Sequence, residues 1–202
     1  MRPSDCVGCK LFPCANVNHQ GYVIPAVEIT PETVRIVLIS EAAPANLANY
    51  YYAQGSPLFE QTTVEAFRDA GADVSSMQDI LDLGVYLTTA AKCGKVGYGI
   101  GTPTIKECSH ILERELDLFP NATIWLLMGD VSIKAVNEIA RRAGRKRVIP
   151  AAPTYKIRGG EFSFQGKRVL PSYLQAGPSF FIEKNKRKMI AEAITTALRL
   201  VS

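Results

Sequence analysis

Features that define several protein classes are scarce or missing in this sequence. Only two of its 202 residues are histidine and one is tryptophan. No apolar run reaches the roughly 18–20 residues that span a bilayer, and the N-terminal residues lack the apolar core of a signal peptide. No internal repeat and no linker is visible. We therefore expect no membrane segment, no secretory leader and no repeat architecture.

The composition that is present is typical of a globular protein. The chain is 47% hydrophobic and 21% charged, with a formal net charge of +4. This balance excludes a disordered chain, a collagen and a heptad rod. The length suits one domain with a full core that needs no disulfide. We expect a soluble, cytoplasmic, monomeric protein with a single domain over residues 1–202.

Short apolar segments alternate with amphipathic ones along the chain. The expected strands are 34–40, 85–89, 123–128 and 168–172. The expected helices are 61–70, 104–118, 131–143 and 182–200, and a hairpin is expected over 154–170. Apolar strands that alternate with helices favour a parallel sheet covered on both faces. The predicted fold is α/β, a three-layer α/β/α sandwich around a central, mainly parallel four-stranded sheet.

The ends of the predicted strands indicate where a ligand site lies. In open parallel sheets, ligands bind beyond the carboxyl ends of the strands. Four stretches follow the predicted strands: 41–46, 89–93, 129–130 and 172–179. A pocket for a small molecule or a base is expected where these stretches converge.

The five cysteines are unusual for a reducing compartment, where cysteines tend to be metal ligands or catalytic groups. Cys6 and Cys9 form a CxxC motif, and Cys93 and Cys108 lie 15 residues apart later in the chain. The spacing alone fits a thioredoxin-like redox pair, a structural zinc site, buried free cysteines or an iron–sulfur cluster. A thioredoxin-like pair follows a strand, whereas Cys6 precedes every predicted strand.

Three segments that contain these cysteines resemble a known family. They are DCVGCKL at residues 5–11, VYLTTAAKC at 85–93 and KEC at 106–108. They are similar to the CxxC-basic-Leu opening, the VYITNVVKC strand and the following helix cysteine of the family-four, iron–sulfur uracil-DNA glycosylases. The resemblance implies that Cys6, Cys9, Cys93 and Cys108 hold a [4Fe-4S] cluster, with Cys14 left over.

The similarity extends over most of the chain. Residues 36–41 resemble the strand before the family's Gly-Glu-x-Pro-Gly loop, and residues 55–59 resemble its Gly-x-Pro-Phe segment. Residues 124–129 resemble its third strand, and residues 169–173 the strand before its last motif. The implied fold is the same three-layer sandwich, as one uracil-DNA glycosylase-like domain preceded by a cysteine segment.

The resemblance also implies an activity. Such a protein acts in base-excision repair: it flips a damaged base, uracil or another deaminated base, out of single- or double-stranded DNA and hydrolyses its N-glycosidic bond. Glu41 is the candidate catalytic carboxylate, although a carboxylate near a helix N-terminus is an equally good explanation of it. The candidate base-pocket residues are Ala43, Leu58, Phe59, Thr89, Tyr173, Leu174 and Gln175.

Two positions depart from the family's pattern. Thr89 stands where the family reads uracil with asparagine, and Leu174 stands where it has the histidine that supports the leaving base. Two interpretations follow. One is a glycosylase with altered specificity or mechanism, in which Tyr173 or Gln175 contributes to base reading. The alternative is a catalytically inactive, nucleic-acid-binding member of the superfamily. A redox protein is disfavoured, because ferredoxin-type CxxCxxC runs are missing.

Basic residues are concentrated in two parts of the chain. Residues 134–158 contain eight basic side chains and one acidic side chain, and residues 184–188 contain four basic side chains. Such clusters suit phosphate contacts, although they are also typical of a solvated surface. The candidate DNA-binding residues are Lys92, Arg145, Lys146, Arg147 and Lys184.

Overall fold

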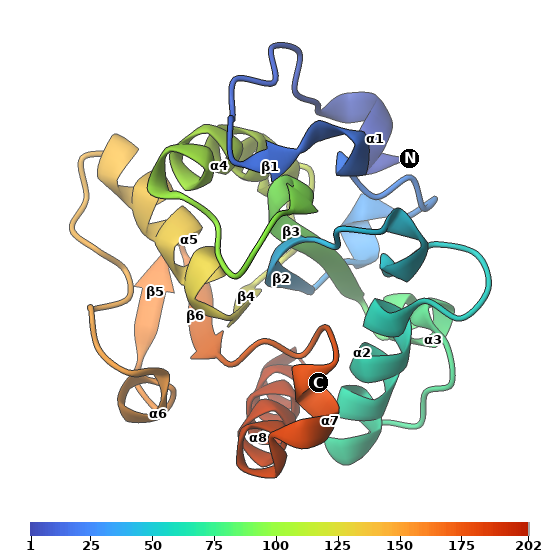
Figure 1. Cartoon of the computed structure of the whole chain (residues 1–202). Helices are drawn as coiled ribbons and strands as arrows, with labels where there is room; N and C mark the ends of the chain where they lie inside the picture. The colour runs from blue at the N-terminus through green and yellow to red at the C-terminus, as the bar shows by residue number, and fades with distance from the viewer. Residues whose placement is uncertain (202) are drawn as a thin grey trace.

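The structure is a computed structural model that describes residues 1–201. Its centre is one sheet of six strands in the order β1-β3-β2-β4-β6-β5 (Figure 1). The strands are β1 (Val17–Asn18), β2 (Ile36–Ala43), β3 (Val85–Lys95), β4 (Ile124–Met128), β5 (Phe162–Phe164) and β6 (Lys167–Ser172). The four long strands are parallel, and β1 and β5 are short antiparallel additions at the two edges. The α/β fold is confirmed, but the sheet has six strands rather than the predicted four.

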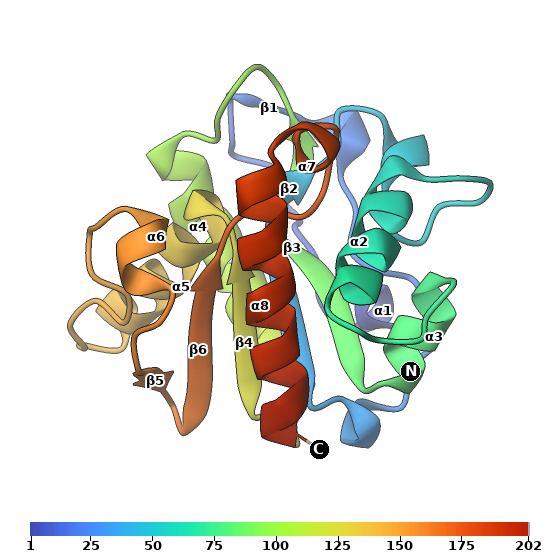
Figure 2. The same ribbon diagram turned by 90° about the horizontal axis from the view of Figure 1, so that it is seen from below.

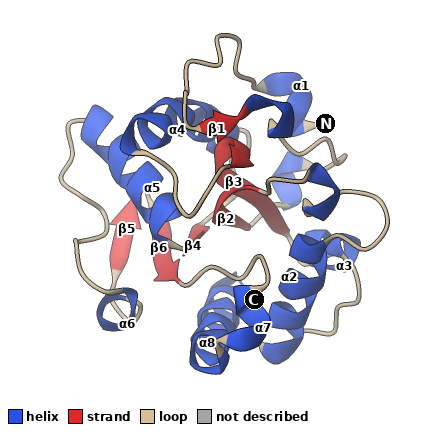
Figure 3. Ribbon diagram, in the orientation of Figure 1, coloured by secondary structure: helices blue, strands red, loops and turns tan. Residues whose placement is uncertain are grey.

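Helices cover both faces of the sheet (Figures 2 and 3). The α-helices are α1 (Pro3–Cys6), α2 (Leu58–Asp69), α3 (Met77–Asp82), α4 (Thr102–Leu116), α5 (Asp130–Arg142), α6 (Thr154–Ile157), α7 (Ser179–Ile182) and α8 (Lys184–Val201). Helices α4 and α5 pack on one face, and α2, α3 and α8 on the other. These are the layers that the alternating pattern predicts.

The side-chain alternation of the strands builds two cores. In β2, Ile36 and Leu38 face α2 and α8, whereas Val37 and Ile39 face α4 and α5. Successive side chains point to opposite faces of a sheet, so a strand that is covered on both faces is apolar at nearly every position. The same alternation continues to the carboxyl edge, where it decides which polar side chains share a face.

Most differences from the predicted elements are in short segments. Strand β3 runs through residue 95 instead of ending at 89, so it carries Cys93. The predicted hairpin over 154–170 is only partly correct, because residues 154–157 form α6 and the hairpin consists of β5 and β6. Its turn uses Gln165 and Gly166, both with positive φ.

The N-terminal segment is fastened to the sheet through β3. In β1, Val17 pairs with Lys95 and Asn18 pairs with Gly94. The backbone of Gly21 lies so close to Gly94 that a Cβ on Gly21 would be 2.8 Å from the Gly94 Cα. Within residues 1–201, no helix has both the length and the apolar character needed to cross a bilayer.

Candidate functional site

Polar side chains gather at the carboxyl edge of the sheet, on the face covered by α2 and α8. Ser40 and Ser172 lie near the carboxyl ends of β2 and β6, Thr89 lies within β3, which continues to Lys95, and all three are buried. Ser40 and Thr89 are paired neighbours in the parallel ladder. They point to the same face as Leu38, Leu87 and Leu170 because each lies two residues further along its strand. The edge therefore combines a buried setting with several hydroxyl groups.

A chain of hydrogen bonds connects this edge to the loop after β6. The Gln175 Nε2 donates to the Tyr51 hydroxyl over 2.9 Å, and that hydroxyl donates to the Ser40 Oγ over 2.7 Å. The Ser40 hydroxyl in turn donates to the Thr88 carbonyl. Burial raises the pKa of Tyr51 well above its ordinary value, so the hydroxyl stays neutral. The chain holds the Gln175 amide in one orientation, with its Nε2 engaged.

Three buried polar atoms at this edge have no hydrogen-bond partner among residues 1–201. They are the Thr89 Oγ1, the Ser172 Oγ and the Gln175 Oε1. A buried polar group without a partner costs about 1–3 kcal/mol. Such atoms are therefore uncommon in a folded protein, and each of these three marks a position where a ligand could supply the missing partner.

Half-buried apolar and aromatic side chains surround these atoms. Leu58 and Phe59 begin α2, and the Phe59 ring lies 5.3 Å from the Tyr51 ring between centroids. Tyr173 and Leu174 follow β6 and pack against the same core as Phe59. Phe59, Thr89, Tyr173, Leu174 and Gln175 thus lie on the face of the sheet that α2 and α8 cover.

Ala43 is buried at an irregularity of the sheet rather than in a loop. The register between β2 and β3 shifts between Ala42 and Ala43, so Ala43 pairs with Gly94. Strand β2 therefore continues through the segment that the sequence analysis took as the first loop. Ala43 presents backbone at the carboxyl edge and has no exposed surface.

Glu41 lies at the same edge but on the side of α4 and α5. Its Oε1 accepts hydrogen bonds from the backbone N–H of Asp130, at 3.0 Å, and of Val131, at 3.5 Å. These are unpaired donors of the first turn of α5, and the helix dipole favours a negative charge there. The second carboxylate oxygen is 3.9 Å from the Lys95 Nζ. Gly129 permits this contact, since a Cβ there would be 2.6 Å from the Glu41 Oε1.

Lys92 corrects one prediction of the sequence analysis. It was a candidate DNA-binding residue, but it has no exposed surface and cannot contact a phosphate. Its ammonium group forms an ion pair with Glu115 of α4 and donates to the Thr88 Oγ1 and the Thr89 carbonyl. Glu115 also accepts from the Tyr86 and Thr88 hydroxyls. This network packs directly beneath the strand segment that carries Thr89.

The other basic candidates are exposed but separated. Arg145, Lys146 and Arg147 follow the C-terminal end of α5, about 20 Å of helix away from the carboxyl edge where α5 begins. Arg145 and Arg147 line a groove of about 500 Å³ between α5 and the following loop, and Lys146 lies outside its lining. Lys184 begins α8 and is exposed just after the loop that carries Tyr173 and Gln175. Only Lys184 of this set lies near the predicted pocket.

Four cysteines line one cavity between the N-terminal segment, β3 and α4. The cavity has a volume of about 420 Å³, and its cysteines are Cys9, Cys14, Cys93 and Cys108. Cys6, a predicted ligand, lies outside this lining and is exposed. Cys14, which the resemblance left over, takes part in it. Within residues 1–201 no three histidine, cysteine or acidic side chains surround one point closely enough to hold a single metal ion.

The environment of these thiols differs from that of a surface cysteine. Burial, and then the nearby thiols of Cys108, Cys14 and Cys9, raise the pKa of Cys93 to about 12. Burial likewise raises the pKa of Cys108 to about 11. Without a positive charge in the cavity these two groups stay protonated at neutral pH. A cationic iron centre would reverse that preference, because metal binding takes the thiolate form.

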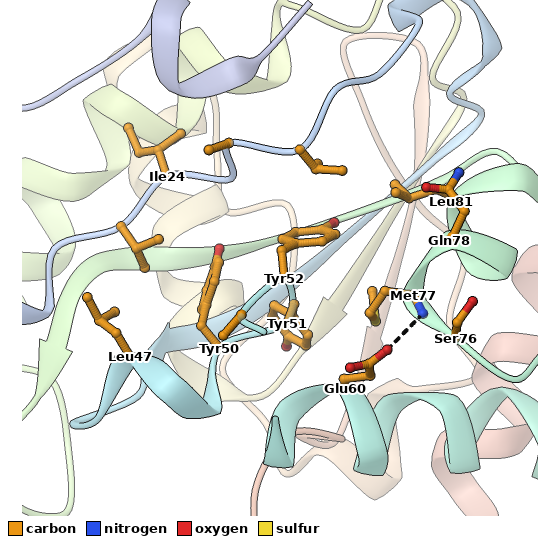
Figure 4. A pocket seen from close by; sticks show the side chains of 14 residues that line it. Ile24, Leu47, Tyr50, Tyr51, Tyr52, Glu60, Ser76, Met77, Gln78 and Leu81 are labelled. Carbon is orange, nitrogen blue, oxygen red and sulfur yellow. Dashed lines mark hydrogen bonds between the residues drawn. The ribbon is translucent and has the colours of Figure 1, made fainter. Parts of the chain in front are cut away.

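A second cavity, of about 530 Å³, lies beside the outer edge of β3 (Figure 4). Tyr50, Tyr51 and Tyr52 separate it from the sheet. The Tyr52 hydroxyl donates to the Leu87 carbonyl and accepts from the Leu87 N–H. It therefore pairs the edge of β3 in place of a neighbouring strand. None of the predicted site residues lines this cavity.

The sequence analysis missed several residues of the site. Ser40 and Ser172 end strands on the same face as Thr89, so the period-two pattern of the strands was a usable signal for both. Glu115 lies on the buried side of α4 with Cys108, Ile111 and Leu112. A glutamate in an apolar stripe needs a buried partner, and Lys92 is the lysine within an apolar strand. Nothing local to Tyr51 indicates its position.

Comparison with known protein families gives a match. The family model described as the uracil DNA glycosylase superfamily matches residues 27–197. The match includes the carboxyl edge, Cys93 and Cys108, and it begins after the first three cysteines. No curated protein matches the chain.

Proposed function

The chain belongs to the uracil-DNA glycosylase superfamily, and we propose that it is a DNA glycosylase of base-excision repair that removes a deaminated base. The bond between C1′ of the sugar and the base nitrogen breaks, and the base leaves with the bonding electron pair. Water adds to C1′ and loses a proton, which leaves an abasic site and a free base. Such an enzyme first flips the nucleotide out of the stack.

The unpartnered polar atoms at the carboxyl edge carry this proposal. Uracil and hypoxanthine each present a ring N–H donor next to a carbonyl acceptor. The Gln175 Oε1 accepts from that N–H, and the Thr89 hydroxyl donates to that carbonyl. Together the two side chains make the two hydrogen bonds, one accepted and one donated, that a single asparagine amide makes in a bidentate contact. The Gln175 Nε2 already donates to the Tyr51 hydroxyl, so the Gln175 atom left for the base is the acceptor Oε1.

Entry of a base requires a movement at the edge, because Thr89 and Gln175 have no exposed surface. Phe59, Tyr173 and Leu174, which pack against the core on the same face, are only half-buried. The Phe59 ring stacks on the flipped base after this displacement. Leu174 cannot supply the positive charge that a histidine would place by the leaving base. The Thr89 hydroxyl stabilises developing negative charge there instead.

Glu41 supplies the negative charge for the sugar. An oxocarbenium-like transition state carries positive charge on the ring, and a carboxylate fixed nearby stabilises it. The Glu41 Oε1 is held by the N-terminus of α5, and its second oxygen, 3.9 Å from the Lys95 Nζ, faces the sugar or water. The helix thus fixes the carboxylate before the reaction.

Replacing Glu41 with glutamine separates its two roles. The amide oxygen still accepts from the Asp130 N–H, so we expect stability to change little. Loss of the charge should lower the excision rate by about 10- to 100-fold, or about 1.4–2.7 kcal/mol in the barrier. Single-turnover kinetics and urea unfolding of the same preparation measure the two effects. A large loss of stability with an unchanged rate would show that Glu41 only caps α5.

The first turn of α8 supplies phosphate contacts beside the pocket. It carries Lys184 and Lys188 and no acidic residue. Lys186 lies over the Tyr173 ring, 5.5 Å from its centroid, and pairs with Glu183. A helix N-terminus with exposed lysines favours anions. DNA bound at the carboxyl edge therefore meets α8 before it meets the loop at Arg145.

Two double variants with equal charge loss test which surface binds DNA. Replacing Lys184 and Lys188 with alanine should weaken binding and lower the slope of log Kd against log salt by about two units. Replacing Arg145 and Arg147 with alanine should change the slope by less. Fluorescence anisotropy with a labelled oligonucleotide, over a series of salt concentrations, measures both. A larger change in the slope on replacing Arg145 and Arg147 would indicate that the DNA binds on the α5 side.

We also propose a [4Fe-4S] cluster in the cysteine cavity. The cavity fits the group by its donor set, since four cysteine thiols are the ligands of such a cluster and each binds a different iron. When bound, the cluster supplies a cross-link between the N-terminal segment, β3 and α4, and its binding free energy adds to that of folding. Of the residues that would hold it, Cys93 lies four residues beyond Thr89 in β3.

A panel of substrates tests the proposed activity. Single- and double-stranded oligonucleotides with one uracil, hypoxanthine or xanthine are incubated with the protein and then treated with alkali. We expect strand cleavage at the modified base in at least one substrate and none in the unmodified strand. Tight binding to all of them without cleavage would contradict the proposal and identify a binding protein.

A further inference from the structure

The N-terminal segment offers three cysteines for two positions in the cysteine cavity. Cys93 lies in the buried part of β3 and Cys108 lies in α4, so both are fixed by the sheet and the helix layer. Two more thiols reach the cavity from the N-terminal segment, and these are Cys9 and Cys14. Of the CxxC pair, Cys9 lines the cavity and Cys6 lies outside it.

Strand pairing holds Cys14 beside Cys93. Cys14 precedes Val17 by three residues, and Val17 and Asn18 pair with Lys95 and Gly94, which follow Cys93 directly. The Cys14 carbonyl is also hydrogen bonded to the His19 Nε2 over 2.7 Å. Cys14 is therefore fixed by the turn that leads into the sheet.

The segment before Cys14 forms a turn around Cys9. The Phe12 N–H donates to the Cys9 Sγ over 3.3 Å, and Phe12 has a φ of 46°. The Phe12 ring packs on Tyr22, whose hydroxyl accepts from the Cys9 N–H. The turn thus presents Cys9 and Cys14 to the cavity together.

Other contacts keep Cys6 away from the cavity. Helix α1 is fastened to the segment before β2 by the hydrogen bond from the Ser4 N–H to the Pro25 carbonyl, and the N-terminal amine donates to the Ile29 carbonyl. The Cys6 thiol is directed at the Arg2 carbonyl, 3.7 Å away, and at the Met1 Sδ. To enter the cavity, Cys6 would have to break this docking.

We propose that Cys14, rather than Cys6, is the fourth ligand, so that the cluster is held by Cys9, Cys14, Cys93 and Cys108. The inference rests on the proposed cluster and replaces the CxxC pair by a pair with four residues between the cysteines. Cys6 is then a free thiol on the surface.

Two matched variants, Cys6→Ser and Cys14→Ser, test this ligand set. Each is purified without oxygen, and iron, acid-labile sulfide and absorbance near 400 nm are measured. We expect wild type and Cys6→Ser to retain about four irons per chain, and Cys14→Ser to lose at least one iron and much of the absorbance. Retention in Cys14→Ser, or loss in Cys6→Ser, would overturn the inference. Wild type without iron would instead refute the proposed cluster.

Alkylation of the unmodified protein gives a second test that does not depend on the folding of a variant. Native protein is treated with iodoacetamide, then unfolded, and each cysteine is identified by mass spectrometry. Cys6 should be modified quickly, while Cys14 stays protected until a chelator removes the iron. Protection of Cys6 together with rapid modification of Cys14 would assign the ligand role to Cys6.

Discussion

Replacing Lys92 with methionine is expected to lower the free energy of unfolding by about 3–5 kcal/mol. The change leaves the Glu115 carboxylate in the interior without its cation. It also removes the donor to the Thr88 Oγ1 and the Thr89 carbonyl. Loss of one member of a buried pair is costly because the remaining charge is desolvated without compensation. Urea unfolding followed by circular dichroism measures the effect.

Two controls separate this effect from a general loss of charge. Removing both charges, with Lys92→Met and Glu115→Leu together, should restore part of the stability, because no unpaired charge remains. Lys186→Met breaks the exposed pair with Glu183 and should cost only about 0–1 kcal/mol. If Lys92→Met is as harmless as Lys186→Met, the buried network does not stabilise the sheet edge.

The second large effect is expected on excision. Replacing Thr89 with valine and Gln175 with leucine removes the donor and the acceptor of the proposed base contact. We expect the double variant to excise its base about 100- to 1000-fold more slowly than wild type. Thr89 contributes only an unpartnered hydroxyl, but Gln175 also donates from its Nε2 to the Tyr51 hydroxyl, so we expect the double variant to lose about 0.5–1.5 kcal/mol of stability. Single-turnover rates on the substrate found in the panel give the comparison.

The exposed Thr196 of α8 provides a control of the same chemistry. Thr196→Val removes a hydroxyl that bonds only to the preceding turn of the helix, and it should excise at the wild-type rate. Equal rates for the double variant and for Thr196→Val would place base reading elsewhere in the protein.

The regular part of the fold was predictable because it follows from local patterns. Residues 85–89 are apolar or β-branched, which is typical of a strand. In residues 131–143 the apolar side chains recur with a helical period, which ends before Gly144. The misses have physical reasons. Strand β1 has two residues and exists through its pairing with β3, which no local pattern encodes. Helix α3 is short, although the capping box of Ser76 and Asp79 was a visible signal.

The site was predictable where it follows strand ends, and less so where it depends on packing. Gln175 follows the carboxyl end of β6, where the carboxyl-edge rule predicts a site, whereas Thr89 lies within β3 because that strand continues to Lys95. The prediction for Lys92 was wrong because a lysine beside a cysteine in the sequence fits both a DNA contact and a buried ion pair. The two are distinguished only by the position of Glu115, which the fold brings to Lys92. The choice between Cys6 and Cys14 depends on which turn reaches β3, and spacing cannot show that.

Direct detection of the released base tests the central claim of this account. Wild-type protein is incubated with the substrate strand, and the products are separated by mass spectrometry before any alkali is added. The account predicts one free deaminated base for each intact strand with an abasic site, and almost none from the double variant at Thr89 and Gln175. A cleaved strand without free base, or no product from any deaminated base, would contradict it.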